Sequence, residues 1–253
     1  MRNLLIVLVA FLIYYGVKEY FGDLMKSADM VFHSRAVSYF IVYLVIGTPL
    51  FLATLLIRKE GTVISALGVG KGALTGLVAA LIFSIPMFIG GMIFYTLTSG
   101  ISVERLLMAT VFAGSFEELY YRGFLFGMLF RFTNLGFIPS VLLSAVLFAS
   151  GHVYQSPDFT TATGIFLTTF IGAFFFAWLY AEWQLNLWVP IFLHTFMNLA
   201  WEIFSVSDNA LGGLTSNLFR AMTIALAIIL TLIYQRKKEI PLSVSRSTLW
   251  RKS

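Results

Sequence analysis

Three short segments of this chain combine residue types that could together activate water and cleave a polar bond. They read EELYYR at 117–122, FASGH at 148–152 and HTFMN at 194–198. Each lies in, or closes, a long apolar stretch. An ionisable side chain at bilayer depth costs at least a few kcal/mol, so such residues normally mark a function. The segments supply carboxylates, imidazoles and an amide.

The first segment places two acids beside one base. On a helix, Glu118 and Arg122 are neighbours on one face, where an ion pair offsets the charge of Arg122. Glu117 points about 100° away, so this pairing leaves it unneutralised. A carboxylate in a low-dielectric pocket has a raised pKa, which suits a general base acting on water. The alternative is that both acids merely balance Arg122 in a polar patch between helices.

The histidine segments are ambiguous when each is taken alone. His194 and Asn198 project from one helical face and could hold a metal or donate hydrogen bonds to an oxyanion. A hydrogen bond between helices is the simpler interpretation of an isolated HxxxN pattern. His152 closes its apolar stretch, where a histidine is usually just solvated. We assign no role to His33, which lies in a polar loop.

The composition indicates that the helices that must position these groups lie in a lipid bilayer. The chain has 253 residues, 59% hydrophobic and 11% charged, and its mean hydropathy is +0.88. Soluble domains carry roughly 45–50% apolar and about 25% charged residues. We therefore expect an all-α, polytopic transmembrane helix bundle. About eight spans are predicted, since each needs about 20 mainly apolar residues: 4–20, 36–57, 73–98, 105–130, 135–151, 162–181, 187–204 and 214–234.

The chain is expected to form one integral membrane domain over 1–253, with the motifs in a core at about 105–204 and a basic cytoplasmic tail at 235–253. Lys and Arg gather on the side of both termini, chiefly in that tail, which predicts cytoplasmic termini. The absence of cysteine excludes disulfides, thiolate metal sites and a cysteine nucleophile. No basic face interleaved with aromatics occurs in a polar region, so we expect no nucleic-acid partner.

Two further charged residues lie in the last two predicted spans. Glu202 is one turn beyond Asn198, close to the membrane edge, and Arg220 lies in the final span. We expect both to be structural, with Arg220 either pairing with Glu202 or binding a lipid headgroup.

Taken in order, the three segments resemble the signatures EExxxR, FxxxH and HxxxN/D of the CAAX-protease and bacteriocin-processing family (CPBP, or Abi) of intramembrane proteases. The resemblance covers about residues 105–204 and shows no departure at the motif positions. It implies hydrolysis of a peptide bond of a membrane-embedded or lipidated protein or peptide substrate, within the bilayer.

The resemblance also implies roles for individual residues. Glu117 would activate the water beside His152, while His194 and Asn198 would stabilise the carbonyl oxygen. Glu118 and Arg122 would support the motif helix. A Zn²⁺ ion held by His152, His194 and Glu117 is the alternative, with an open position for water. We favour glutamate-activated water without an obligatory metal.

Two other functions remain open. A polar cluster at mid-depth also fits a proton-coupled transporter, although the segments show no matching pair of Gly/Pro-broken helices in two halves. The second alternative function is that of a non-catalytic membrane scaffold or immunity protein of the same fold. The chain looks like a bacterial cell-membrane protein, which favours a peptide precursor or membrane protein over a prenylated substrate.

Overall fold

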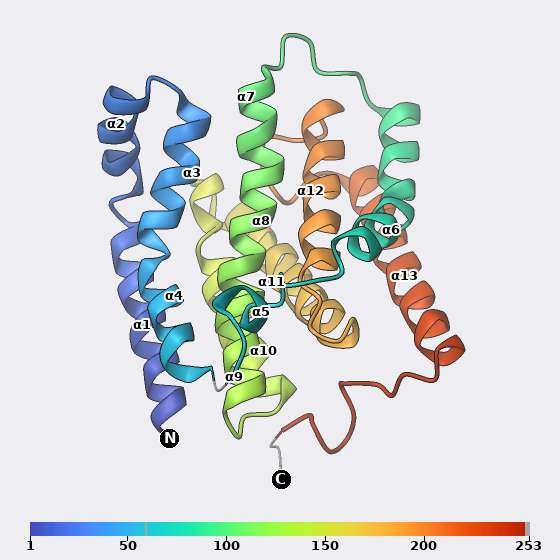
Figure 1. Ribbon diagram of the computed structural model, residues 1–253. Helices are drawn as coiled ribbons and strands as arrows, with labels where there is room; N and C mark the ends of the chain where they lie inside the picture. Colours follow the sequence, from blue (N-terminus) through green and yellow to red (C-terminus); the bar gives the residue numbers. More distant parts are fainter. Residues whose placement is uncertain (59, 251–253) are drawn as a thin grey trace.

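The computed structural model describes residues 1–58 and 60–250, and these residues form a helical bundle without a β-strand (Figure 1). The all-α prediction is confirmed. Lys59, Arg251 and Lys252, which contributed to the charge imbalance between the two sides, lie outside the described residues. The helices outside the motif helix are α1 (Arg2–Lys18), α2 (Phe21–Phe32), α3 (Arg35–Ile46), α4 (Thr48–Ile57), α5 (Val63–Ala66), α6 (Ala73–Phe94), α10 (Phe137–Ser150), α11 (Phe159–Glu182), α12 (Trp188–Ile203) and α13 (Leu214–Lys237).

The first two predicted spans are bent. The axis turns by 66° between α1 and α2 and by 42° between α3 and α4. The second break has a local cause, since Pro49 lacks an N–H and begins a new helix. Gly47 at this break leaves room for Tyr120, whose hydroxyl donates to the Tyr43 carbonyl at 2.6 Å.

By length and composition, fewer helices qualify as membrane spans than the eight expected. Four helices of the described chain are long and apolar enough to cross a membrane, or up to six if each bent pair counts as one span. Helix α12, with 16 residues, is shorter than the span of 187–204 predicted for it. The motif helix of 105–130 does not qualify because it is divided into short segments and carries several charges.

That motif helix runs through the centre of the bundle, drawn in green in Figure 1. It consists of α7 (Val103–Leu106), η1 (Leu107–Phe112), α8 (Ala113–Glu117), η2 (Glu118–Phe126) and α9 (Gly127–Phe132), where η1 and η2 have π-type hydrogen bonding. Such π segments are frequent at functional sites. The boundary between α8 and η2 falls between Glu117 and Glu118.

Helix α12 packs beside the motif helix because glycine permits a close approach. A Cβ added to Gly114 would lie 2.8 Å from the Thr195 Oγ1 and 3.0 Å from the Thr195 nitrogen. The opposite face of α12 lies against α6, where a Cβ on Gly76 would lie 2.7 Å from the Trp188 backbone. These contacts bring His194 next to the acids of the motif helix.

Helix α10 ends at Ser150, two residues before His152. After Ser150 the chain makes a single 3₁₀ turn, η3 (Val153–Gln155), and starts α11 beyond Asp158. The Asp158 carboxylate caps α11 by accepting from the Thr161 N–H at 2.7 Å, and this hydrogen bond lowers the pKa of Asp158.

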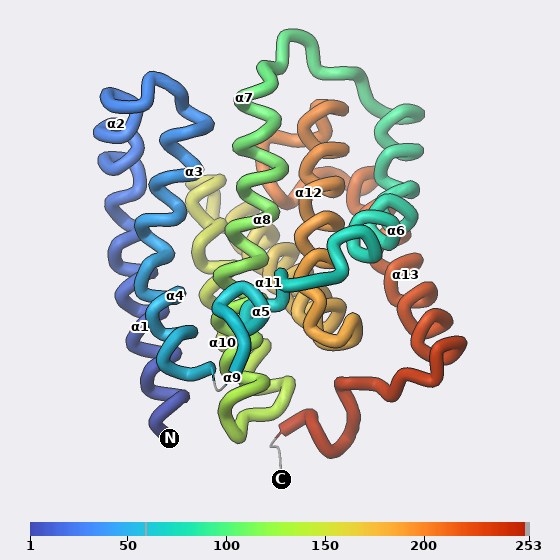
Figure 2. Tube along the Cα trace, viewed as in Figure 1, coloured from blue at the N-terminus to red at the C-terminus, as the bar shows by residue number. Residues whose placement is uncertain are grey.

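The end of the chain folds back beneath the bundle (Figure 2). Buried Glu182 accepts from the backbone nitrogens of Ser243 and Val244, both at 3.0 Å, and from the Gln235 side chain at 2.7 Å. Residues 136–138 pair with the carbonyls of 248–250. Much of the predicted tail, up to residue 250, is thus docked on the bundle.

Candidate active site

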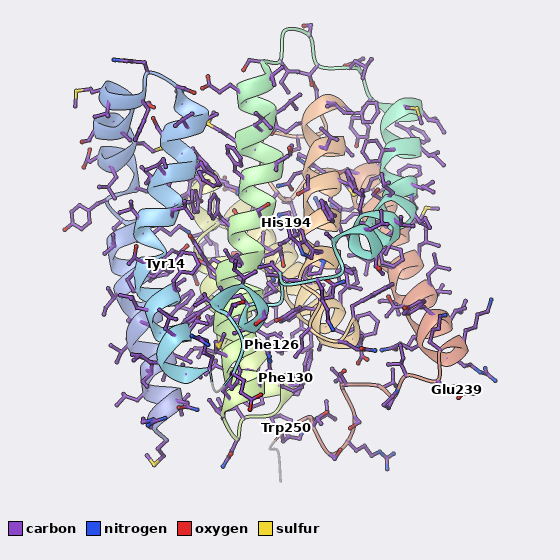
Figure 3. The ribbon with its side chains drawn as sticks, in the orientation of Figure 1. Tyr14, Phe126, Phe130, His194, Glu239 and Trp250 are labelled. Carbon is purple, nitrogen blue, oxygen red and sulfur yellow. The ribbon has the colours of Figure 1, made fainter. Side chains whose placement is uncertain are left out.

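A cavity of about 1090 Å³ lies among the helices that carry the three motifs. Its wall includes residues of the motif helix, of the turn after α10, of α11 and of α12. His194 lies in the middle of the bundle, between α8 and α12 (Figure 3). The candidate catalytic residues all line this cavity: Glu117, His152, His194 and Asn198.

Glu117 is the point on which the two imidazoles converge. Its Oε2 lies 3.9 Å from the Nε2 of His152 and 3.8 Å from the Nε2 of His194. These separations are too long for direct hydrogen bonds. A water oxygen at ordinary hydrogen-bond distance from both atoms of either pair would fit beside the line that joins them. The Glu117 side chain is 22% exposed, so the cavity reaches it.

The second nitrogen of each imidazole is held by an acceptor. The Nδ1 of His152 lies 2.8 Å from the Phe148 carbonyl, and the Nδ1 of His194 lies 2.8 Å from the Glu118 Oε1. Carbonyl and carboxylate oxygens only accept, so Nδ1 carries the proton in both rings. In both rings it is Nε2 that lies toward Glu117. With its proton on Nδ1, the neutral ring of His152 directs the lone pair of Nε2 into this space.

Glu118 and Arg122 are completely buried. The Glu118 Oε1 lies 3.2 Å from the Arg122 Nη1, with side-chain exposures of 0% and 1%. The guanidinium also lies over the rings of Phe148 and Phe176, at 4.2 and 5.5 Å from their centroids. These cation–π contacts add to the neutralisation of Arg122. Glu118 therefore joins Arg122 to His194, a link that helical spacing within the motif could not predict.

Asn198 lies one turn beyond His194 on the same face of α12. Its Nδ2 donates to the Ala109 carbonyl at 3.0 Å, which fixes the amide between α12 and η1. An amide nitrogen carries two hydrogens, so the second remains for a group in the cavity that Asn198 lines.

The metal alternative can be compared with these positions. Two imidazole nitrogens and a carboxylate form a donor set that Zn²⁺ accepts. The described residues contain no group of three or more His, Asp or Glu arranged as a metal centre. The Zn²⁺ alternative therefore stays a prediction.

The structure thus brings all three predicted motifs to one cavity. His152 lies within 3.9 Å of Glu117, although it was expected near the outer end of its span. Of the two alternatives given for Arg220, pairing with Glu202 does not occur among the described residues, since Glu202 pairs with Arg105 at 3.2 Å. The sequence also gave no sign that Phe148 and Phe176 enclose Arg122, because a Phe in an apolar run is unremarkable.

Residues 99–200 match a protein-family model described as Type II CAAX prenyl endopeptidase Rce1-like. This range contains all three motifs and confirms the resemblance to the CPBP family. No curated protein matches the chain.

Proposed function

We propose that this chain, which belongs through its residues 99–200 to the CPBP family of CAAX-type endopeptidases, hydrolyses peptide bonds with a water activated by Glu117. The observation that carries this proposal is the convergence of the Glu117 carboxylate and both imidazole Nε2 atoms within 3.9 Å. The family supports intramembrane endopeptidase activity in general; the roles below are our assignment.

The attack requires an oriented water. We assign Glu117 to accept one proton of the water, while the Nε2 lone pair of His152 accepts its second hydrogen bond. The water oxygen then bonds to the carbonyl carbon of the peptide. Glu117 later passes its proton to the leaving nitrogen as the C–N bond breaks. One water is consumed, and a carboxylic acid and an amine are released.

The carbonyl oxygen becomes negatively charged during this attack and needs donors. The free hydrogen of the Asn198 amide is one donor. We assign His194 to supply the second donor from Nε2 in its imidazolium form, while its Nδ1 donates to the Glu118 carboxylate. Arg122 holds Glu118 in place through the buried ion pair.

A Glu117→Gln variant tests the proposal, because it keeps the shape of the side chain but removes the base. With a fluorogenic farnesylated CAAX peptide and purified protein, cleavage should fall by about 10²–10⁴-fold, with unchanged thermal stability. Glu239→Gln is the matched control, since Glu239 is exposed at the end of α13, far from His194 (Figure 3). Full activity of the Glu117→Gln protein would contradict the proposal.

The same variant addresses the two rival functions. Proton or solute flux in liposomes that survives the loss of Glu117 would indicate a transporter. A cellular phenotype that Glu117→Gln restores in a null strain would indicate a scaffold or immunity role. We propose a peptide precursor or membrane protein as the physiological substrate, and comparative peptidomics of membranes containing either protein identifies it.

A further inference from the structure

Helix α11 contributes a glycine to the wall of the cavity. The α11 residues that line it are Thr168, Thr169, Gly172 and Phe176. Glycine is among the least favourable residues in a helix interior, because it loses much conformational freedom there. Its place in the middle of a helix of 24 residues therefore calls for a physical reason.

Close packing explains other helical glycines of this chain but not Gly172. A Cβ added to Gly114 would contact Thr195, and one added to Gly164, also in α11, would lie 2.9 Å from the Leu211 side chain. A Cβ added to Gly172 would meet nothing within 4 Å. Because Gly172 lines the cavity, the missing side chain leaves a recess in the cavity wall.

This recess lies close to the catalytic groups. Gly172 precedes Phe176 by four positions, so the two lie about one helical turn apart on the same face of α11. The Phe176 ring centroid lies 5.4 Å from that of the His194 ring. Consecutive residues of a peptide are about 3.8 Å apart. A substrate residue beside the scissile bond can therefore direct its side chain over Gly172.

The surroundings of the recess favour an apolar occupant. The Phe176 ring is at one end of it, and Met197 of α12 packs against the apolar cluster that contains Phe176 and also lines the cavity. The Thr169 hydroxyl donates to the Ile165 carbonyl at 2.7 Å, so it is satisfied within its own helix. An apolar side chain that enters this space gains free energy in proportion to the area it buries.

We propose that Gly172 is a specificity-determining residue, because the recess above it accepts a large apolar side chain beside the scissile bond. A larger residue at position 172 would occupy the recess itself and exclude that side chain. This inference rests on the proposed function, since the peptide must lie across the catalytic groups.

Binding measurements separate this role from catalysis. In the Glu117→Gln background, fluorescent farnesylated pentapeptides with a CAAX ending are titrated in two series. Each series varies one of the two residues that follow the farnesylcysteine between Ala and Phe. We expect Phe to bind about 10- to 100-fold more tightly than Ala in one series, because full burial of a side chain of this size stabilises the complex to that extent.

Adding Gly172→Leu should remove this preference. The leucine fills the recess, so it should weaken the Phe peptide by about 10- to 100-fold and leave the Ala peptide nearly unchanged. Gly172→Ala should give an intermediate result. Gly16→Leu is the matched control, because a Cβ at Gly16 also meets nothing within 4 Å but Gly16 is not part of the cavity lining. That variant should keep the full preference for Phe.

Equal binding of the Ala and Phe peptides in both series, or a preference that survives Gly172→Leu, would overturn the inference. So would equal weakening of both peptides by Gly172→Leu, since the leucine would then act by displacing α11. A preference for Phe that depends on Gly172, in a protein that never cleaves the peptide when Glu117 is present, would retain the recess and refute the proposed hydrolysis. Cleavage that depends on Glu117 without any size preference would do the reverse.

Discussion

At the scale of single residues, the two adjacent acids have different surroundings and therefore different expected roles. Glu117 is partly exposed to the cavity and has no hydrogen-bond partner within the described residues. Glu118 is fully buried and contacts both His194 and Arg122. We therefore propose that Glu117 reacts and Glu118 positions His194; the two have different surroundings because successive helical positions differ by about 100°.

Glu118→Gln should impair both stability and activity. The change leaves the buried Arg122 without a counter-charge and weakens the acceptor for His194. Breaking a buried pair in this way costs about 3–5 kcal/mol. Thermal unfolding in detergent should show a clear loss for this variant and little change for Glu117→Gln. A stable but inactive Glu118→Gln protein, together with an active Glu117→Gln protein, would reverse the assigned roles.

Asn198→Ala should retain measurable activity. Loss of one oxyanion donor typically lowers the rate by about 10²–10³-fold, less than the loss of the base together with its proton transfer. The effect should fall on kcat, because the hydrogen bond strengthens as charge develops on the carbonyl oxygen. Steady-state kinetics with the farnesylated peptide measure it. A change in KM alone would assign Asn198 to substrate binding.

At the scale of elements, the position of Glu117 relative to His194 depends on how closely the motif helix approaches α12. Gly114 precedes Glu117 by about one turn and contacts Thr195, the neighbour of His194. Any Cβ at position 114 must displace either the Thr195 side chain or the backbone of α12. The site is therefore sensitive to a residue that performs no chemistry.

Gly114→Ala should lower kcat/KM by about 10- to 100-fold, since a displacement of about 1 Å at reacting groups can cost 10²-fold. Gly16→Ala is a matched control in α1, where an added Cβ meets nothing within 4 Å. That control should be as active as the wild type and slightly more stable, because alanine favours a helix. Equal activities of the two variants would show that the α8–α12 contact tolerates extra volume.

The elements also show what the sequence could predict. Apolar length indicates helices well, and motif spacing within a helix indicates which groups share a face, as for Glu118 and Arg122. Helix ends and contacts between helices are harder to predict from the sequence. The depth of His152 depends on the short α10, and the contact of Glu118 with His194 depends on Gly114. Neither follows from local pattern, because both depend on how separate helices pack.

At the scale of the whole molecule, the cavity extends toward one end of the bundle, and we expect it to open there. Both described ends of the chain lie at one end of the bundle, and α1 and α12 run away from it (Figure 1). The cavity is lined by Lys18 and Glu19, where α1 ends, and by residues 207–210, beyond α12. One end of the cavity therefore lies toward the face opposite the termini.

The distribution of Lys and Arg predicts cytoplasmic termini, which would place this opening on the outer side of the membrane. Because the chain has no cysteine, single introduced cysteines report accessibility without background. A membrane-impermeant maleimide applied to intact cells should label Asp208→Cys, at the exposed cavity mouth, but not Glu239→Cys at the end of α13. Permeabilised cells should give both signals and so control for expression. The reverse pattern would place the termini outside and the cavity in the cytoplasm, so that peptides made in the cell would reach Glu117 without crossing the membrane.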